Sequence, residues 1–306
     1  MAENVFKLTE RAMRPLTRLF AGRPTRVAVL QMRLHHNQRS RNLDTVLQGM
    51  TQAAAAGVDL LCLPAACCTG LNFPSLKRDA EPLDGPLLTQ LREAAQRLGL
   101  MLVLGLLERG EGELAGQIFD SAVCIGADGA LLGVYRRRCL WSGERAYLSA
   151  GSATPQLIQT PWGRLGLLVS YDLRFPEAWR PYYLQEADVI VCVANLFTRY
   201  SHAVPTLVRA RAAECSCYVV LASCVGENGF AMLDYLGGSM VVDGCVMEAS
   251  SDALRDVLAA APPGPTEQML QAELYMRQRA QRAAQLPYLE DYLQQWADTA
   301  PGAEVA

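Results

Sequence analysis

Two hydrophobic periodicities alternate along the chain. Short apolar runs predict buried strands, and apolar residues three or four positions apart predict amphipathic helices. Strands are predicted at Arg26–Met32, Asp59–Leu63, Met101–Leu106, Ile118–Ile125, Ala130–Arg136, Leu165–Val169, Asp188–Val193, Tyr218–Ser223, Ser239–Asp243 and Met269–Leu274. Because helical patterns separate most of these runs, the order is typical of an α/β protein.

The helix that follows Asp84 has the clearest predicted boundaries. Pro86 suits a first helical position, and Gly99 suits the left-handed residue that ends a helix. Further helices are predicted around Leu43–Met50, from about Pro176, from about Pro205 and at Tyr275–Gln285, while Tyr288–Trp296 is either helical or irregular.

No linker rich in proline, glycine or serine divides the pattern. The weakest candidate boundary is Ala249–Thr266, which contains the predicted loop Ala260–Pro265. Too few residues follow this stretch to form a second domain. We therefore expect a leader at residues 1–25 and a single domain at residues 26–306.

The leader has a basic helical pattern, with Lys7, Arg11, Arg14 and Arg18 at helical spacing. Such a pattern is compatible with a helix that lies on a membrane surface or on a partner. The alternative is a solvated segment packed loosely on the domain. We favour the solvated segment and expect no membrane contact by residues 1–20.

Composition narrows the possible partners. With 51% hydrophobic and 19% charged residues, the chain can bury a large core, and its net charge of −3 argues against nucleic acid as a main partner. The ten cysteines include no C-x-x-C pair, and no histidine lies at ligand spacing from a cysteine. We therefore expect free thiols in a cytoplasmic protein, with no metal and no cofactor.

Three predicted strands end in unusual local sequences: Leu63–Gly70, Gly133–Leu140 and Gly166–Glu177. Reacting groups in α/β proteins gather where strands end. These three segments together resemble the nitrilase superfamily of carbon–nitrogen hydrolases. The third is the most specific, because it matches the family's pattern at Tyr171, Asp172, Arg174, Phe175, Pro176 and Glu177.

The resemblance fails at the positions that carry the family's chemistry. Ser170 stands where the family has its nucleophilic cysteine, and Ala65 replaces the general-base glutamate. Arg137 replaces the catalytic lysine, and Cys139 replaces a histidine nearby. Glu144 matches the second glutamate, which in the family supports the lysine.

The resemblance extends from about Arg26 to the last helix, and includes Ala210–Glu214 and Gly237–Met240. It implies an α/β fold with a nitrilase-like αββα four-layer sandwich. It also implies a homodimer, often with the helix after Ser170 at the interface, or a heteromer with an active relative.

The three substitutions weaken the family mechanism together. A serine hydroxyl is a much weaker acid than a thiol and needs a well-placed base. Ala65 has no group that accepts a proton, and an arginine at position 137 keeps its charge but does not release a proton. We therefore expect the family's Glu-Lys-Cys mechanism to be absent.

Other interpretations of the neighbouring residues stay open. Glu144 either serves Ser170 as a substitute base or forms an ion pair with Arg137, and we favour the ion pair. Arg137 itself is an open candidate for an anion site. Cys67 and Cys68 are either a displaced nucleophile or packed thiols, and we favour packed thiols.

The remaining site residues follow from their positions beside these segments. Asn195, Trp141 and Tyr171 are expected to line the pocket beside Ser170. Arg136 and Arg138 are expected to be solvated, and Arg211 and Glu214 to form a structural pair on one helix.

Two functional hypotheses result. The first is a catalytically inactive protein that binds a small amide- or carboxylate-bearing ligand or assembles with another chain. The second is a divergent hydrolase or acyl-transfer enzyme for a small amide or nitrile, with Ser170 as nucleophile, Arg137 as oxyanion stabiliser and Glu144 as base.

Overall fold

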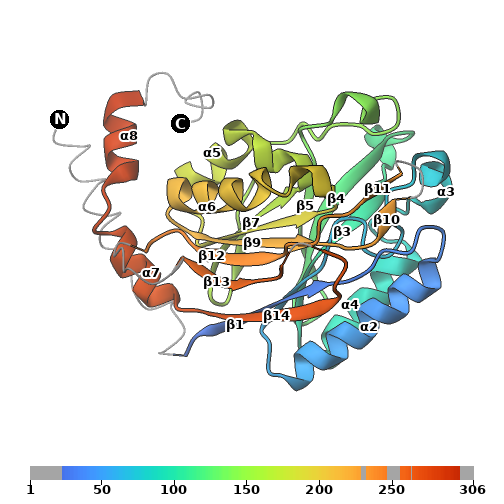
Figure 1. Ribbon diagram of the computed structural model, residues 1–306, viewed down its shortest axis with the longest axis horizontal. Coiled ribbons are helices and arrows are strands. Elements are labelled where there is room, and N and C mark those ends of the chain that lie inside the picture. Colours follow the sequence, from blue (N-terminus) through green and yellow to red (C-terminus); the bar gives the residue numbers. More distant parts are fainter. Residues whose placement is uncertain (1–22, 229–231, 247–255, 263, 297–306) are drawn as a thin grey trace.

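The computed structural model describes residues 23–228, 232–246, 256–262 and 264–296. Two six-stranded sheets face each other in these residues (Figure 1). The first has the order β14 (Gln268–Leu274), β1 (Thr25–Gln31), β2 (Leu60–Cys62), β3 (Met101–Arg109), β4 (Ile118–Ile125) and β5 (Leu131–Arg136). The second has the order β13 (Val257–Ala260), β12 (Met240–Asp243), β9 (Tyr218–Ser223), β8 (Val189–Ala194), β7 (Gly163–Val169) and β6 (Ile158–Thr160).

Each sheet has three parallel strands at its centre. In the first sheet β1, β2 and β3 are parallel, and in the second β7, β8 and β9 are parallel. Helical crossovers join most of these strands, as parallel pairing requires. The carboxyl ends of the three strands therefore lie at one edge of each sheet.

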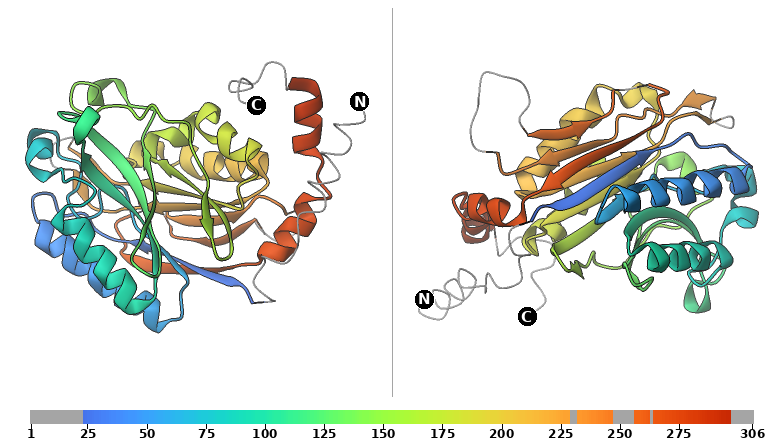
Figure 2. Two further views of the ribbon diagram at one scale, coloured as in Figure 1. Left: turned by 180° about the vertical axis from the view of Figure 1, so that it is seen from behind. Right: turned by 90° about the horizontal axis from the view of Figure 1, so that it is seen from below.

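Helix pairs cover the outer faces of the two sheets (Figure 2). The pair α2 (Arg39–Ala55) and α4 (Pro86–Leu98) packs on the first sheet, and α5 (Pro176–Leu184) and α6 (Ala203–Cys215) pack on the second. The αββα four-layer sandwich expected from the resemblance is thus confirmed.

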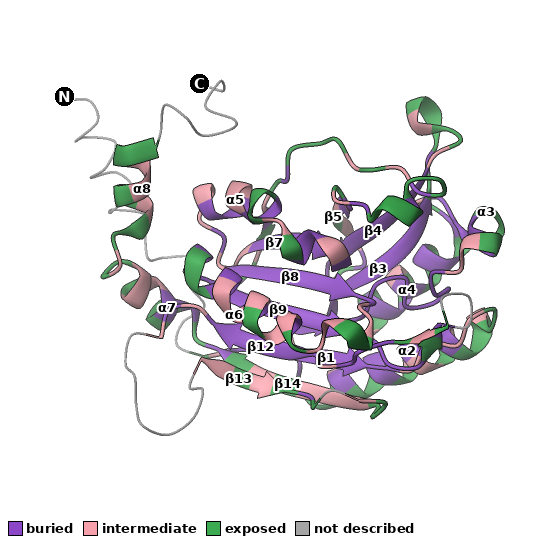
Figure 3. Cartoon of the chain, turned by 45° about the horizontal axis from the view of Figure 1, so that its top comes forward, coloured by how far each residue is buried: buried purple, intermediate pink, exposed green. Residues whose placement is uncertain are grey.

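Strand β2 shows how side-chain alternation separates the two hydrophobic layers. Leu60 and Cys62 belong to the cluster between the sheets, whereas Leu61 and Leu63 belong to the cluster under α2 and α4. Successive side chains of a strand point to opposite faces, so one short apolar run supplies both layers. Figure 3 shows that the central strands are buried along most of their length.

The predicted first and last positions of α4 are confirmed. The helix begins at Pro86, and Gly99 ends it in the left-handed conformation with φ of 62°. The turn at Asp128–Gly129 is also present, because Gly129 has a positive φ of 79° and the Asp128 side chain accepts a hydrogen bond from the Ala130 amide.

Several sequence predictions need correction. Residues 257–260, within the stretch expected to be a weak boundary, form the edge strand β13, and β6 was not predicted. The predicted leader was one residue too long at its end, since Thr25 already belongs to β1. Most of the leader, residues 1–22, lies outside the described residues.

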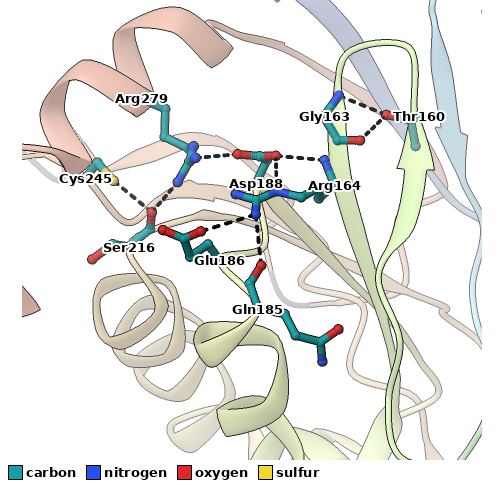
Figure 4. A network of polar contacts seen from close by, with 9 residues as sticks. All are labelled: Thr160, Gly163, Arg164, Gln185, Glu186, Asp188, Ser216, Cys245 and Arg279. Carbon is teal, nitrogen blue, oxygen red and sulfur yellow. Dashed lines mark hydrogen bonds and ion pairs between the residues drawn. The ribbon is translucent and has the colours of Figure 1, made fainter. Parts of the chain in front are cut away.

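The C-terminal part forms two helices, α7 (Met276–Ala283) and α8 (Tyr288–Trp296), so the helical alternative holds for residues 288–296. Figure 4 shows how α7 is attached: Arg279 forms an ion pair with Asp188 and donates a 2.9 Å hydrogen bond to the Ser216 carbonyl. On its other side, Asp188 accepts a 2.7 Å hydrogen bond from the Arg164 amide. These contacts join α7 to the amino end of β8.

None of the helices in the described residues is long and apolar enough to cross a membrane.

Candidate active site

Ser170 lies directly after β7, at the start of the 3-10 turn Ser170–Arg174. Its φ of 44° is a left-handed conformation, which is uncommon for a residue other than glycine. The side chain is 2% exposed. Strained backbone of this kind clusters at functional sites, so the serine occupies a nucleophile-like position at the end of its strand.

The Ser170 hydroxyl is directed at Asn195 rather than at a base. Its Oγ donates a 2.9 Å hydrogen bond to the side-chain Oδ1 of Asn195, and it accepts a 3.2 Å hydrogen bond from the backbone N–H of Asn195. Asn195 follows β8, the strand next to β7, so the two residues meet at adjacent carboxyl ends. An amide oxygen does not take the hydroxyl proton, so this contact holds the serine without activating it.

Arg137 is held among carboxylates. Its Nη2 lies 2.8 Å from the Glu144 Oε2, and its Nη1 lies 3.3 Å from the Asp120 Oδ2. The Arg137 side chain is 2% exposed. Since two carboxylates face one guanidinium, the local charge does not favour a further anion at Arg137.

The favoured interpretation of Glu144 agrees with this geometry. Besides contacting Arg137, Glu144 accepts a 2.9 Å hydrogen bond from the Trp141 amide through the same Oε2. Both contacts hold the Glu144 side chain in place. The hydrogen bonds of the Ser170 hydroxyl go to Asn195 instead.

Asp120 is a site residue that sequence reasoning missed. It is fully buried on β4, and burial raises the pKa of its carboxyl to about 6 despite the attraction of Arg137. Neither side-chain oxygen of Asp120 has a hydrogen-bond partner among the described residues. An acidic residue inside the apolar run Ile118–Ile125 was the available signal, because buried carboxylates are rare unless paired.

Asp172 joins the second and third segments. Its carboxylate accepts 2.9 Å hydrogen bonds from the Tyr135 hydroxyl and from the Cys139 amide, and a 3.3 Å bond from the Val169 amide. Burial raises its pKa, although these hydrogen bonds oppose the rise. Asp172 matched the family pattern, but its role in placing the Arg137 segment beside Ser170 was not predicted.

Ala65 is fully buried, in the cluster between the sheets that also contains Val169 and Ala194. These two residues directly precede Ser170 and Asn195. On the other side, β3 approaches so closely that a Cβ on Gly105 would lie 2.2 Å from the Ala65 Cα. The first segment therefore packs into the same region as the third, with a methyl group at position 65.

The other candidate pocket residues are placed as follows. Tyr171 is half-buried and packs edge-on against Phe175, with ring centroids 5.1 Å apart. Trp141 is 45% exposed, and its ring lies against Gly143. Among the described residues, the side-chain hydrogen bonds of Ser170 involve Asn195 and neither of these two side chains.

The cysteines nearby are poor nucleophiles. The Sγ atoms of Cys67 and Cys68 lie 3.9 Å apart, and the contact between them together with burial raises the pKa of Cys67 well above its usual value. Burial, together with Asp172, raises the pKa of Cys139 to about 12. Because the thiolate is the reactive form, the raised pKa values make Cys67 and Cys139 poor nucleophiles at neutral pH, and Cys68 is buried beside Cys67.

Two expectations about arginines are settled. Arg138 is exposed as expected, but Arg136 is not solvated: it forms an ion pair with the buried Glu108 and lies 4.9 Å over the Phe119 ring. Arg211 forms the expected pair with Glu214 at 2.7 Å. Arg211 also donates to the Leu173 carbonyl, so it supports the turn that contains Ser170.

Comparison with known proteins identifies the family of this chain. The carbon-nitrogen hydrolase family model matches residues 26–246. The chain belongs to the carbon-nitrogen hydrolase family. Among curated relatives, deaminated glutathione amidase of Homo sapiens is 32% identical over 67% of this chain and 66% of its own length. The (R)-stereoselective amidase of a Pseudomonas species is 29% identical over 76% of this chain and 84% of its own length.

Solved structures support the same assignment. A CN-hydrolase superfamily protein from Xanthomonas campestris, which carries an arsenic adduct in its active site, has a TM-score of 0.77 and 26% identity. The alignment covers 88% of this chain and 97% of that one. A mutant of the amidase from Nesterenkonia sp. AN1, with acrylamide added at its active-site cysteine, has a TM-score of 0.70 and 25% identity, and the alignment covers 86% of this chain and 98% of that one. In this member of the carbon–nitrogen hydrolase family, residue 170 of the third segment is a serine.

Proposed function

We propose that this member of the carbon–nitrogen hydrolase family is catalytically inactive and acts by binding a ligand or by assembling with another chain. The observation that carries the proposal is the hydrogen bond from the Ser170 hydroxyl to the Asn195 Oδ1. A serine becomes a nucleophile when a base removes its proton, and here an amide oxygen occupies the place of that base. Ala65, at the position that we match to the family's base, has no group that accepts a proton.

The charge around Arg137 supports the same proposal. An oxyanion needs a donor that is free to stabilise developing negative charge. Arg137 instead faces Asp120 and Glu144, at 3.3 and 2.8 Å. Its charge is therefore already compensated in the resting protein.

A small amide is the ligand class that best fits the retained site. The Asn195 side chain is 7% exposed, and its Nδ2 has no hydrogen-bond partner among the described residues. A buried donor without a partner favours a ligand that offers a carbonyl oxygen. A carboxylate is less suited, because Arg137 is neutralised and carboxylates surround it.

The proposal is tested by intact-protein mass spectrometry after exposure to an activated ester such as p-nitrophenyl acetate, with peptide mapping of residue 170. We expect no acyl adduct on Ser170, and we expect Ser170→Ala to show the same added masses relative to its own unmodified mass. An adduct that maps to Ser170 and is absent from the variant overturns the proposal and supports the divergent enzyme.

The assembly part of the proposal has its own test. We propose that α5, the helix after Ser170, forms the interface of a homodimer or of a heteromer with an active relative. Glu177 is exposed at the start of α5, so Glu177→Arg places an opposite charge at the interface. In analytical ultracentrifugation we expect this variant to dissociate, while Glu113→Arg, at an exposed site after β3, keeps the assembly. Identical sedimentation of both variants and the unmodified protein contradicts an interface at α5.

A further inference from the structure

A cavity lies away from Ser170, where the chain leaves β1. Its volume is about 360 Å³, within the range of about 300–1,000 Å³ that small-molecule sites occupy. It is lined by Arg33, Leu34, His35, His36, Gln38 and Glu227. None of these residues belongs to the candidate active site.

The cavity is built at the seam between the two sheets. Arg33 forms a parallel bridge with Val225, just beyond β9, and backbone hydrogen bonds of 2.9 and 3.0 Å flank it. Gly226 has a positive φ of 109°, and a Cβ there would lie 3.1 Å from the Arg33 Cγ. This close approach brings Glu227, the first residue of β10 (Glu227–Asn228), into the lining of the same cavity as the residues that follow β1.

The imidazole of His36 is a fixed, neutral part of the wall. Its ring stacks on Tyr235, with centroids 5.9 Å apart, and its Nε2 lies 3.3 Å from the Tyr235 hydroxyl. That hydroxyl accepts a 2.9 Å hydrogen bond from the Asn228 amide, so its own proton is available to the Nε2. Burial lowers the pKa of His36, which keeps the ring uncharged at neutral pH.

Arg33 and Glu227 provide opposite charges that do not neutralise each other. In the described residues no ion pair joins them, and neither forms an ion pair with another residue. The Arg33 guanidinium makes one long hydrogen bond, of 3.5 Å, to the Pro265 carbonyl. His35 adds no fixed charge, because burial and the nearby Arg41 lower its pKa.

We propose that this cavity binds a free α-amino acid. Arg33 would receive the carboxylate, because a guanidinium pairs with a carboxylate through two parallel hydrogen bonds, and Glu227 would receive the ammonium group. Leu34 and the aliphatic part of Gln38 form the less polar wall for the side chain. A molecule that carries only one of the two charges leaves the opposite wall charge unpaired, which makes the site selective.

The ligand class is tested by thermal shift with each of the twenty protein amino acids at millimolar concentration, followed by isothermal titration with the best one. We expect at least one to raise the melting temperature. We further expect the carboxamide of that amino acid, which lacks the carboxylate, and its N-acetyl form, which lacks the ammonium group, to bind at least about tenfold more weakly. If no amino acid shifts the melting temperature, or if both derivatives bind as tightly as the free amino acid, the proposal is overturned.

Two variants test whether Arg33 binds the carboxylate and Glu227 binds the ammonium group. For Arg33→Gln, the affinity for the free amino acid is expected to fall to the affinity of the unmodified protein for the carboxamide. For Glu227→Gln, the affinity for the free amino acid is expected to fall to the affinity of the unmodified protein for the N-acetyl form. Lys77→Gln and Glu113→Gln remove the same charges at exposed sites outside the cavity and should leave the affinity unchanged. Unchanged affinity in both cavity variants places the ligand elsewhere and contradicts the proposal. This outcome is independent of whether Ser170 reacts.

Discussion

Replacing Asp120 by asparagine tests the electrostatics of the site most sharply, because two opposing effects predict opposite signs. Asp120 is fully buried and lies 3.3 Å from Arg137. Removing one partner of a buried ion pair commonly destabilises a protein by about 3–5 kcal/mol, because the other charge is left uncompensated. Here, however, Arg137 keeps the shorter contact to Glu144, at 2.8 Å.

The direction of the pKa shift decides between the two effects. The Asp120 pKa is about 6 with the attraction of Arg137 already included, so its surroundings disfavour the ionised form. A rise from 3.8 to about 6 corresponds to about 3 kcal/mol. We therefore expect Asp120→Asn to stabilise the protein at pH 7, by about 3 kcal/mol at most.

The pH dependence of stability independently checks whether Asp120→Asn stabilises or destabilises the protein. Because the folded pKa of Asp120 lies above the unfolded value, the folded state holds the proton to higher pH. The contribution of the protonated Asp120 carboxyl to the free energy of unfolding is fully present below about pH 4, and it is lost as the pH rises through 6. Asparagine does not titrate, so the gain of the variant should be near zero at pH 4 and largest at pH 7.

Urea unfolding at pH 4, 5, 6 and 7, followed by circular dichroism, measures the difference. Glu93→Gln, an exposed carboxylate on α4, is the matched control and should shift stability by less than about 0.5 kcal/mol at every pH. A loss of more than about 1 kcal/mol at pH 7 would falsify the reasoning, because the attraction between Asp120 and Arg137 would then exceed the burial penalty. A gain that is equal at pH 4 and pH 7 would also contradict it.

Three further predictions concern packing, attachment and reactivity. Gly105→Ala should lower the free energy of unfolding by about 3 kcal/mol in urea titration, because its Cβ would lie 2.2 Å from the Ala65 Cα; a loss below about 1 kcal/mol would show that the two backbones move apart easily. Arg279→Met should cost about 3 kcal/mol and speed hydrogen exchange in α7, because it removes the ion pair with Asp188, whereas the exposed Arg277→Met should do neither. Cys139, with a pKa raised to about 12, should react with iodoacetamide about a thousandfold more slowly than a free thiol in peptide-mapped labelling at pH 8; equal rates would contradict its assignment as a packed thiol.

The sequence predicted the central strands and α4 well, because their residues are specified locally. Proline and glycine mark the ends of α4, and the apolar runs of the central strands are long enough to recognise. Strand β13 was missed since it is a short edge strand whose side chains alternate between half-buried and exposed. Its partner in the sheet, rather than its own composition, makes it a strand.

Several candidate site residues could be named from the sequence, but Asp120 was missed and the contacts within the site were not predicted. The family pattern singled out Ser170, Ala65 and Arg137 as candidates, yet the partners of Ser170 and Arg137 come from other strands. Asp120 reaches Arg137 from the neighbouring strand, and Asn195 reaches Ser170 from the next parallel strand. Likewise, Arg136 was expected in solvent because its partner Glu108, 28 positions away, becomes its neighbour only after folding.

The central claim, that the site lacks a base able to start the reaction, is tested most directly by ammonia release from a panel of small amides with the Ser170→Cys variant. This variant restores the family's nucleophile and leaves Ala65 and Arg137 unchanged. The account predicts ammonia release at the buffer rate, as for the unmodified protein, whereas adding Ala65→Glu and Arg137→Lys supplies the missing base and lysine. Ammonia release above the buffer rate by Ser170→Cys alone would contradict the account, because it would show that a base already lies beside residue 170.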